Sequence, residues 1–294
     1  MAARADALPA AVDPVRASPR THPFRRLVRR RGAALGLGVI VFFVALAVLA
    51  PVVSPYDPLA TSWTAIRKAP TSAHWFGTDE IGRDVLARVV WGARASVLAG
   101  VVSVLISLSI GVPVGLLAGY AGGWADMTIS RITDAVLACP FLILAIALAA
   151  FLGPSLTNAM IAIGVSATPV FVRLTRGQTL AIKAEEFILA ARAIGNPPWR
   201  VALRHVLPNV APALIVQSTL SIAAAVIAEA SLSFLGLGQQ PPAPSWGSML
   251  NTAKNYVDNA PWMAVWPGLS IFALVLSFNL VGDGLRDALD PRQS

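Results

Sequence analysis

Between two long apolar segments the chain reads Glu185-Glu186-Phe187-Ile188-Leu189-Ala190-Ala191-Arg192-Ala193-Ile194-Gly195. This stretch interrupts the apolar sequence with polar residues, yet its pattern is that of a helix rather than a loop. Phe187, Ala191 and Ile194 follow the i, i+4, i+7 spacing of one helix face. The sequence therefore predicts an amphipathic helix outside the apolar segments.

The residues that follow predict a turn and a second short helix. Gly195 suits the left-handed backbone position that ends a helix, and Asn196-Pro197 predicts a turn. Pro198 fits the first position of a helix, so we expect one over Pro198–Val206, limited by Pro208. We call residues 185–208 the knuckle.

Composition places the rest of the chain in a membrane. Hydrophobic residues make up 56% of the sequence and charged residues 13%, whereas soluble domains carry about a quarter charged residues. Because lipid offers no hydrogen-bond partners to the backbone, each apolar stretch of spanning length must be a helix. The predicted fold class is an all-α, polytopic membrane protein. The six predicted spans are Ala33–Val53, Ser96–Leu117, Asp134–Leu152, Leu156–Val172, Ala211–Phe234 and Trp262–Val281.

The positive charge reports orientation rather than nucleic-acid binding. The net charge is +8, and 17 of the 23 Lys and Arg residues fall on one side of the predicted spans. The positive-inside rule then places both termini and the knuckle in the cytoplasm. Residues 1–22 are polar and rich in Pro and Ala, so we expect a disordered cytoplasmic tail there, followed by one membrane domain over 23–294.

Three segments connect the spans at length. The cytoplasmic loop covers 173–210, and outer segments cover 54–95 and 235–261. From Asp84 to Arg94 the pattern predicts an amphipathic helix lying at the outer interface. The prolines of 235–261 predict a stiff loop without a regular helix.

Several single residues carry open alternatives. Glu229 lies near the outer part of a span, where an acid is a candidate for the translocation path or a partner in helix packing. Arg131 and Asp134, three residues apart, are expected to pair. Trp246, Trp262 and Trp266 fit an outer aromatic belt or a contact surface. Cys139 is expected to be a buried apolar residue, and no His cluster indicates a metal site.

The knuckle has two interpretations. An amphipathic helix can rest on lipid headgroups, or it can dock into another protein. Ala190, Ala191, Ala193 and Gly195 favour docking, because a membrane anchor needs bulky side chains and a socketed helix needs a thin profile.

Three motifs then resemble one family. Glu186-x-x-x-Ala190-Ala191-x-x-x-Gly195, followed by Leu207-Pro208, looks like the EAA loop of ATP-binding-cassette (ABC) importer permeases. Gly77-Thr78-Asp79-x-x-Gly82-Arg83-Asp84 and the segment from Glu229 to Gly238 resemble the dipeptide/oligopeptide/nickel group. The resemblance runs in chain order from Phe24 to the C-terminus, and the DppC/OppC type of permease subunit fits best.

This resemblance implies a function and a set of partners. The chain would be the transmembrane domain of a type I ABC importer, a multi-pass protein of a bacterial inner membrane that moves peptides, most closely dipeptides, into the cytoplasm. Partners would be a second homologous permease, two ATPase subunits, an extracytoplasmic binding protein and membrane lipid. The chain would not be an enzyme and would hold no cofactor, because it lacks the Gly-x-x-x-x-Gly-Lys-Ser/Thr loop and the ATPase subunits would bind ATP and Mg.

The resemblance also assigns site residues and leaves rivals. Glu186 would orient the knuckle on the ATPase, Ala190, Ala191 and Gly195 would permit close approach, and Leu207-Pro208 would close the site. Importers of nickel chelates or glutathione share these motifs. An ion-coupled secondary transporter is a rival from another class, disfavoured by the few ionisable residues in the spans.

Overall fold

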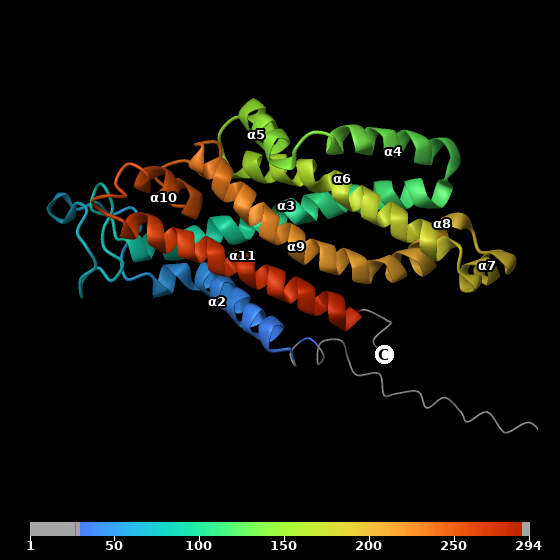
Figure 1. Ribbon diagram of the computed structural model, residues 1–294, viewed down its shortest axis with the longest axis horizontal. Coiled ribbons are helices and arrows are strands. Elements are labelled where there is room, and N and C mark those ends of the chain that lie inside the picture. The colour runs from blue at the N-terminus through green and yellow to red at the C-terminus, as the bar shows by residue number, and fades with distance from the viewer. Residues whose placement is uncertain (1–26, 28–29, 290–294) are drawn as a thin grey trace, which may run out of the picture.

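The structure is a computed structural model that describes residue 27 and residues 30–289. The predicted tail 1–22 lies outside the described residues. Through the described part the chain is built from helices (Figure 1). In chain order they are α2 (Arg31–Val53), the 3-10 turn η1 (Trp63–Ala65), α3 (Val85–Ala121), α4 (Gly123–Leu137), α5 (Phe141–Leu152), α6 (Leu156–Lys183), α7 (Glu186–Ala193), α8 (Pro198–Val201), the π turn η2 (Ala202–Val206), α9 (Leu207–Phe234), α10 (Trp246–Ala253) and α11 (Trp262–Leu289).

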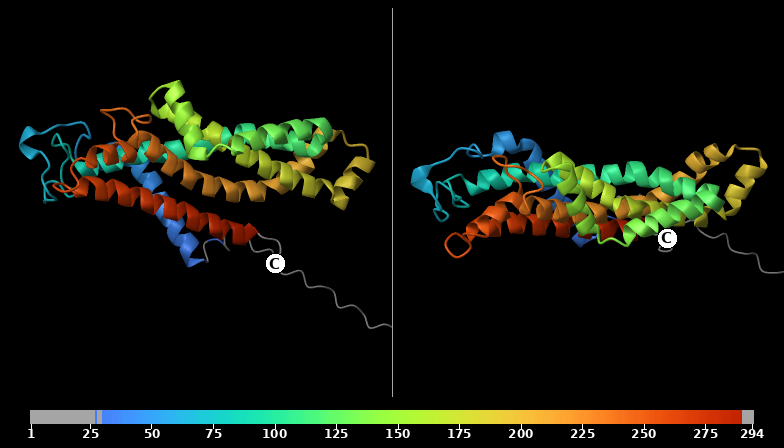
Figure 2. Two further views of the ribbon diagram at one scale, coloured as in Figure 1. Left: turned by 45° about the horizontal axis from the view of Figure 1, so that its top comes forward. Right: turned by 90° about the horizontal axis from the view of Figure 1, so that it is seen from above.

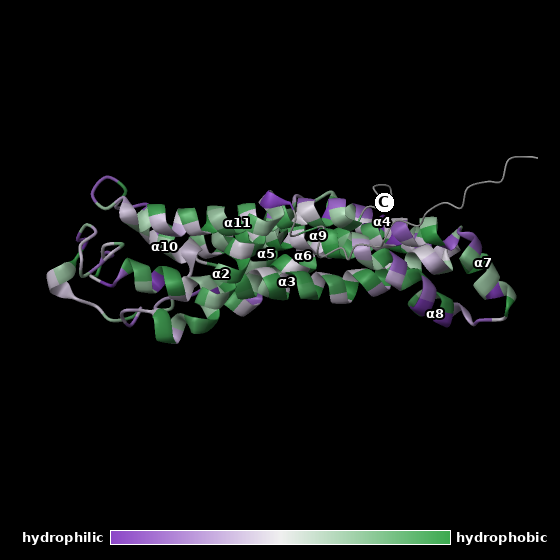
Figure 3. Ribbon diagram, turned by 90° about the horizontal axis from the view of Figure 1, so that it is seen from below, coloured by the Kyte–Doolittle hydropathy of each residue, from purple (hydrophilic) through white to green (hydrophobic). Residues whose placement is uncertain are grey.

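Helices α3, α6, α9 and α11 run along one axis, and α2 crosses them at an angle (Figures 1 and 2). These five helices are long and apolar enough to cross a membrane, and the bent pair α4 and α5 makes a sixth span if it is counted as one. This confirms the predicted all-α fold with six spans. Apolar residues cover the middle of the bundle, and hydrophilic residues gather toward its ends, most clearly on α8 (Figure 3).

The second span differs from the prediction at its outer end. The helix expected to lie flat on the outer interface, Asp84–Arg94, is instead the first part of α3, which continues straight into the span. Of the two arginines in this segment, Arg88 is buried and Arg94 is exposed. The Arg88 side chain is buried, donates to the Pro58 carbonyl at 3.1 Å and lies 3.5 Å from the Asp79 carboxylate. Because Arg88 is satisfied inside the protein, its face of the segment packs against the chain rather than lying on the interface.

The third predicted span is broken rather than straight. It begins earlier, at Gly123, and α4 and α5 meet at an angle of 88°. Pro140 causes the break, because its nitrogen carries no proton and its ring disfavours the helical conformation of Cys139.

The knuckle also differs from the prediction at its second half. Helix α6 continues to Lys183, and α8 runs through the π turn into α9 without stopping at Pro208. In the π turn the Leu207 N–H bonds to the Ala202 carbonyl, five residues back. This wider turn accommodates the ring of Pro208, whose nitrogen carries no proton to donate inside the continuous helix.

Small residues let α3 and α6 pack closely. A Cβ added at Gly115 would lie 2.5 Å from the Val172 carbonyl oxygen, and one at Gly119 would lie 2.7 Å from the Thr179 Cβ. Only a hydrogen atom fits at these two positions. The pair α3 and α6 therefore forms a rigid centre on which α9 also packs.

The outer segment 235–261 contains an unexpected helix. Prolines keep the part before Ser245 irregular, but Ser245 caps α10 and exchanges hydrogen bonds with Ser248. The prediction of a loop without a regular helix was therefore wrong for residues 246–253. The pattern of eight residues was too short to stand out beside the prolines.

Trp246 is buried inside the chain, while Trp262 and Trp266 are half-buried, so for these two the aromatic belt and the contact surface both stay predictions. Trp246 is fully buried and donates to the Val89 carbonyl at 2.9 Å. Trp262 donates to the Thr78 carbonyl at 3.0 Å, and the Trp266 ring stacks on Phe76 with centroids 3.8 Å apart. Their partners come from segments distant in sequence, so the spacing of the tryptophans gave no signal of this core.

Candidate functional site

The knuckle is anchored to the bundle by a small apolar cluster. Ile188 is fully buried and Ala191 nearly so, and both belong to a cluster with Val201, Val206 and residues of α3. The predicted stripe is therefore only partly right. Ala191 packs inward, but Phe187 is 46% exposed and Ile194 is 80% exposed. Helix α7 thus presents one apolar face to its own chain and a second one outward.

Gly195 has the left-handed conformation that the sequence predicts. Its φ is +82°, its N–H bonds to the Arg192 carbonyl at 2.9 Å, and the Asn196 amide donates to the Ala191 carbonyl at 3.0 Å. A Cβ added at Gly195 would meet no atom of the described chain within 4 Å. The glycine therefore serves the turn, and the space beside it is open.

Tyr120, at the C-terminal end of α3, contacts the end of α6 through Lys183 and the knuckle through Arg192. Its backbone carbonyl accepts a hydrogen bond of 2.6 Å from the Lys183 ammonium, and the Arg192 guanidinium lies 5.2 Å from the centre of its ring. Both contacts are attractions between a cation and an electron-rich group. Sequence analysis missed Tyr120, because its partners stand far along the chain.

Ion pairs fix α4 to α6 on the same side of the membrane. Arg176 forms a two-bond pair with Asp126, and Arg173 lies 2.5 Å from Asp134. The predicted pair of Arg131 with Asp134 does not form. The reason is that the neighbouring helix supplies a closer cation, which sequence spacing within one helix does not reveal.

Large apolar side chains stand exposed on the knuckle. We call Phe187, Leu189, Ile194, Trp199 and Leu203 the knuckle surface; their exposed fractions run from 46% to 80%. A groove of about 390 Å³ lies between α3 and α8 and includes Trp199 and Leu203. Apolar side chains left exposed in this way are available for contact with a partner protein or with lipid.

The predicted coupling residues fall into two groups. Glu186, Ala190, Gly195 and Pro208 are exposed, whereas Ala191 is buried and Leu207 is half-buried. The exposed members can touch a partner, and the other two support the knuckle from inside. The assignment of all six residues to coupling stays a prediction.

Glu229 is enclosed between α9 and α3. It is fully buried, and its carboxylate accepts hydrogen bonds from Ser96 at 3.1 Å and from Ser233 at 2.7 Å. This is the helix-packing role, one of the two roles that the sequence predicted for Glu229. A role in the translocation path stays a prediction.

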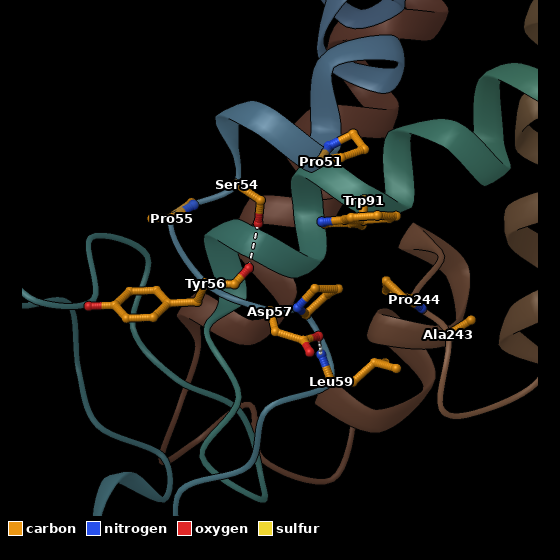
Figure 4. A pocket seen from close by; sticks show the side chains of 10 residues that line it. Pro51, Ser54, Pro55, Tyr56, Asp57, Leu59, Trp91, Ala243 and Pro244 are labelled. Carbon is orange, nitrogen blue, oxygen red and sulfur yellow. Dashed lines mark hydrogen bonds between the residues drawn. The ribbon is translucent and has the colours of Figure 1, made fainter.

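The outer face carries a second hollow, of about 540 Å³ (Figure 4). Its wall is formed by the end of α2, the segment after α2, Trp91 of α3 and residues 243–244. The Trp91 indole N–H has no partner among the described residues. Two local bonds shape its wall: Ser54 donates to the Tyr56 carbonyl at 2.6 Å, and the Leu59 N–H donates to Asp57 at 2.8 Å.

A buried ionic network supports this outer face. Arg83 bonds to Asp79 at 2.6 Å and to Glu80 at 2.5 Å. Burial, and then the neighbouring Asp79 carboxylate, raise the pKa of Glu80 above its usual value. These residues belong to the Gly77–Asp84 motif, which therefore folds the outer segment.

Comparisons with known proteins agree with this architecture. Residues 111–294 match the family model described as the binding-protein-dependent transport system inner membrane component, and residues 18–70 match the N-terminal transmembrane domain of oligopeptide transport permease C. The chain is 45% identical, over 94% of its length and 90% of the relative's, to the dipeptide transport system permease protein DppC of Alkalihalophilus pseudofirmus. It is 46% identical, over 92% of its length and 90% of the relative's, to the glutathione transport system permease protein GsiD of Shigella flexneri.

A solved structure shares the fold. An inward-facing structure of the MetNI methionine ABC transporter superposes with a TM-score of 0.59 at 23% sequence identity, covering 70% of this chain and 97% of the other. At that identity the likeness concerns the arrangement of helices alone.

Proposed function

The chain belongs to the family of binding-protein-dependent transport system inner membrane components, and from this premise we propose that it imports dipeptides as one of two permeases driven by separate ATPase subunits. It is a multi-pass inner-membrane permease of an ABC importer. In the proposal it pairs with a homologous permease, two ATPases and an extracytoplasmic binding protein, and its termini and knuckle face the cytoplasm.

The proposal that a partner protein drives transport rests on the knuckle surface. Five large apolar side chains stand exposed on a segment that is itself anchored by Ile188 and by the contact of Arg192 with Tyr120. A resting place on lipid needs no such rigid anchor. A segment that transmits a partner's motion to the spans does need a rigid anchor, which favours docking of an ATPase subunit.

The helices beside the knuckle supply a route for the motion. Helix α6 ends two residues before α7, and α8 continues through the π turn into α9, so two spans are joined directly to the knuckle. Closely packed helices move as rigid bodies, and a displacement of the knuckle would therefore reach the middle of the membrane. Alternating exposure of a central path to the two faces would follow.

The cargo is assigned from the relatives. A dipeptide permease and a glutathione permease match over nearly the same share of the chain, at 45% and 46% identity. We propose dipeptides, because the family model that matches residues 18–70 is named for oligopeptide transport and the relative from Alkalihalophilus pseudofirmus is named for dipeptide transport. Glutathione is the second candidate on the strength of its own relative.

Vesicle uptake tests the proposal. The assembled transporter would be placed in sealed vesicles with ATP inside and binding protein plus labelled cargo outside. We expect dipeptide uptake that requires both ATP and the binding protein. Uptake driven by an ion gradient without ATP would overturn the drive mechanism, and saturable uptake of glutathione but not of dipeptides would move the assignment to the second candidate.

A further inference from the structure

A pocket lies beside the break between α4 and α5. Its volume is about 340 Å³, and its wall comes from α3, α6 and α9 together with the residues at the break. Most of the lining is apolar. Its polar members are Ser103, Cys139, Ser166, Gln217 and Ser221.

Ser166 is the unusual group in this pocket. Its side chain is 5% exposed, and its hydroxyl has no hydrogen-bond partner among the described residues. An unpaired hydroxyl in an apolar setting lowers the free energy of unfolding. Keeping such a group at this position therefore costs the protein stability. On the α9 side of the same pocket, Gln217 and Ser221 bond to each other at 3.1 Å and keep further hydrogen-bonding capacity.

The start of α5 adds a second set of donors. This twelve-residue helix follows Pro140 and has no side-chain cap, so the N–H groups of Phe141, Leu142 and Ile143 open the helix without a capping partner. Pro140 and Phe141 line the pocket. The beginning of a helix carries a partial positive charge and attracts anions.

The chemistry of the pocket favours a carboxylate. Its wall has free hydroxyl and amide donors and the start of a helix, and no charged side chain lines it. The Ser and Gln groups can accept as well as donate, but the N–H groups at the start of α5 can only donate, which favours a carboxylate over an ammonium group. Every peptide with a free C-terminus carries such a carboxylate. An exposed backbone within the membrane is, moreover, tolerated where it lines a water-filled cavity.

We propose that the pocket at the α4–α5 break binds the C-terminal carboxylate of the peptide during its passage through the membrane. Ser166, Gln217 and the first N–H groups of α5 are the recognising groups. The inference rests on the proposed import of peptides. It adds the place in this chain where the cargo's anionic end is held.

The single cysteine of the chain gives a direct test. Cys139 is half-buried and stands on the pocket wall, and the sequence contains no other cysteine. This placement corrects the expectation of a buried apolar role. In the complete reconstituted transporter the rate of Cys139 alkylation would be measured by mass spectrometry, with a dipeptide or its C-terminal amide present at equal occupancy of the binding protein.

We expect the free-acid dipeptide to slow alkylation of Cys139 and the amide to leave it unchanged. Ser166→Ala should remove this difference. It should also raise the concentration of dipeptide needed for protection about tenfold, which is the effect of one lost hydrogen bond to a charged group. Ser109→Ala is the matched control, because that exposed hydroxyl bonds within its own helix, to the Ile106 carbonyl.

Equal protection by acid and amide, or none by either, would overturn the carboxylate site. The same samples would also be assayed for ATP-dependent uptake. Normal dipeptide uptake alongside an unprotected Cys139 refutes this inference alone, while the absence of dipeptide uptake in the wild-type complex refutes the proposed function on which it rests.

Discussion

The indole N–H of Trp246 donates a hydrogen bond of 2.9 Å to the backbone carbonyl of Val89, which lies 157 residues earlier in the chain. The same ring lies against Gly92, where an added Cβ would come within 2.9 Å of it. Helix α10 is thereby held against the outer part of α3. The two outer segments form one assembly as a consequence, although almost the whole transmembrane chain separates them.

Removing this ring should loosen the outer assembly. Trp246→Ala deletes a fully buried side chain and its hydrogen bond, so we expect a loss of about 3–5 kcal/mol in the free energy of unfolding. Thermal unfolding of the purified protein in detergent would measure the effect. Trp63→Ala is the control, since Trp63 is 77% exposed, and a comparable drop in that variant would contradict the assignment.

Close packing of α3 on α6 gives a second prediction. Gly115→Val would place side-chain atoms where the Val172 carbonyl and Thr175 already lie, at 2.5 and 2.7 Å from the first added carbon. We expect overpacking to cost at least about 1–3 kcal/mol and to lower the yield of monodisperse protein in size-exclusion chromatography. Gly38→Val meets no atom within 4 Å and should behave like the wild type. Equal yields for both variants would show that α3 and α6 can separate freely.

Gly195 tests the coupling role of the knuckle. Gly195→Asp should abolish uptake and cargo-stimulated ATPase activity while the chain still inserts in the membrane, because a carboxylate would occupy the open space beside α7. Gly123→Asp is a close control: Gly123 also has a positive φ and no atom near its Cβ position, so the backbone strain is of the same kind, about 1–2 kcal/mol. Both variants would be assayed in the vesicle system. Retained coupling in Gly195→Asp would remove the knuckle from the mechanism.

Phe187 tests the docking surface without disturbing the fold. Phe187→Ala removes a ring that is 46% exposed, so we expect membrane insertion and thermal stability to stay near wild type. If the ring is buried by an ATPase subunit, its loss should cost more than about 1 kcal/mol of binding, or roughly a fivefold weaker association. Co-purification of the ATPase subunit at decreasing concentration would measure it.

Phe151→Ala provides the comparison for this measurement. Phe151 is 87% exposed but lies on α5, away from the knuckle. Its replacement should leave ATPase association unchanged. An equal loss in both variants would indicate a general effect of removing exposed rings rather than a docking site.

The sequence alone was sufficient for the all-α class of the fold and for the end of α7. Apolar runs of spanning length must be helical in lipid, and this local requirement predicted the all-α fold. The left-handed conformation of Gly195 was likewise predictable, because the backbone at a helix end requires it locally. Its φ is +82°. Both features depend on neighbouring residues in the chain.

The errors arose where a local signal met a distant partner. Arg88 looked like an interfacial charge, but Asp79 and the Pro58 carbonyl satisfy it inside the protein. Asp134 is paired by Arg173 from the next helix rather than by Arg131. No pattern within one segment reveals partners of this kind. Pro208 is a different case, because the feature that lets the helix continue is local: the π turn directly before it.

Sequence by itself therefore determined which parts of this protein are apolar helices of spanning length and where α7 ends, because lipid and backbone geometry act on each segment separately. Tertiary structure alone decided which face of α7 is free, how the outer segments join through Trp246, and where the break at Pro140 meets Ser166. These depend on contacts between residues far apart in the chain. Such contacts exist only once the helices have packed.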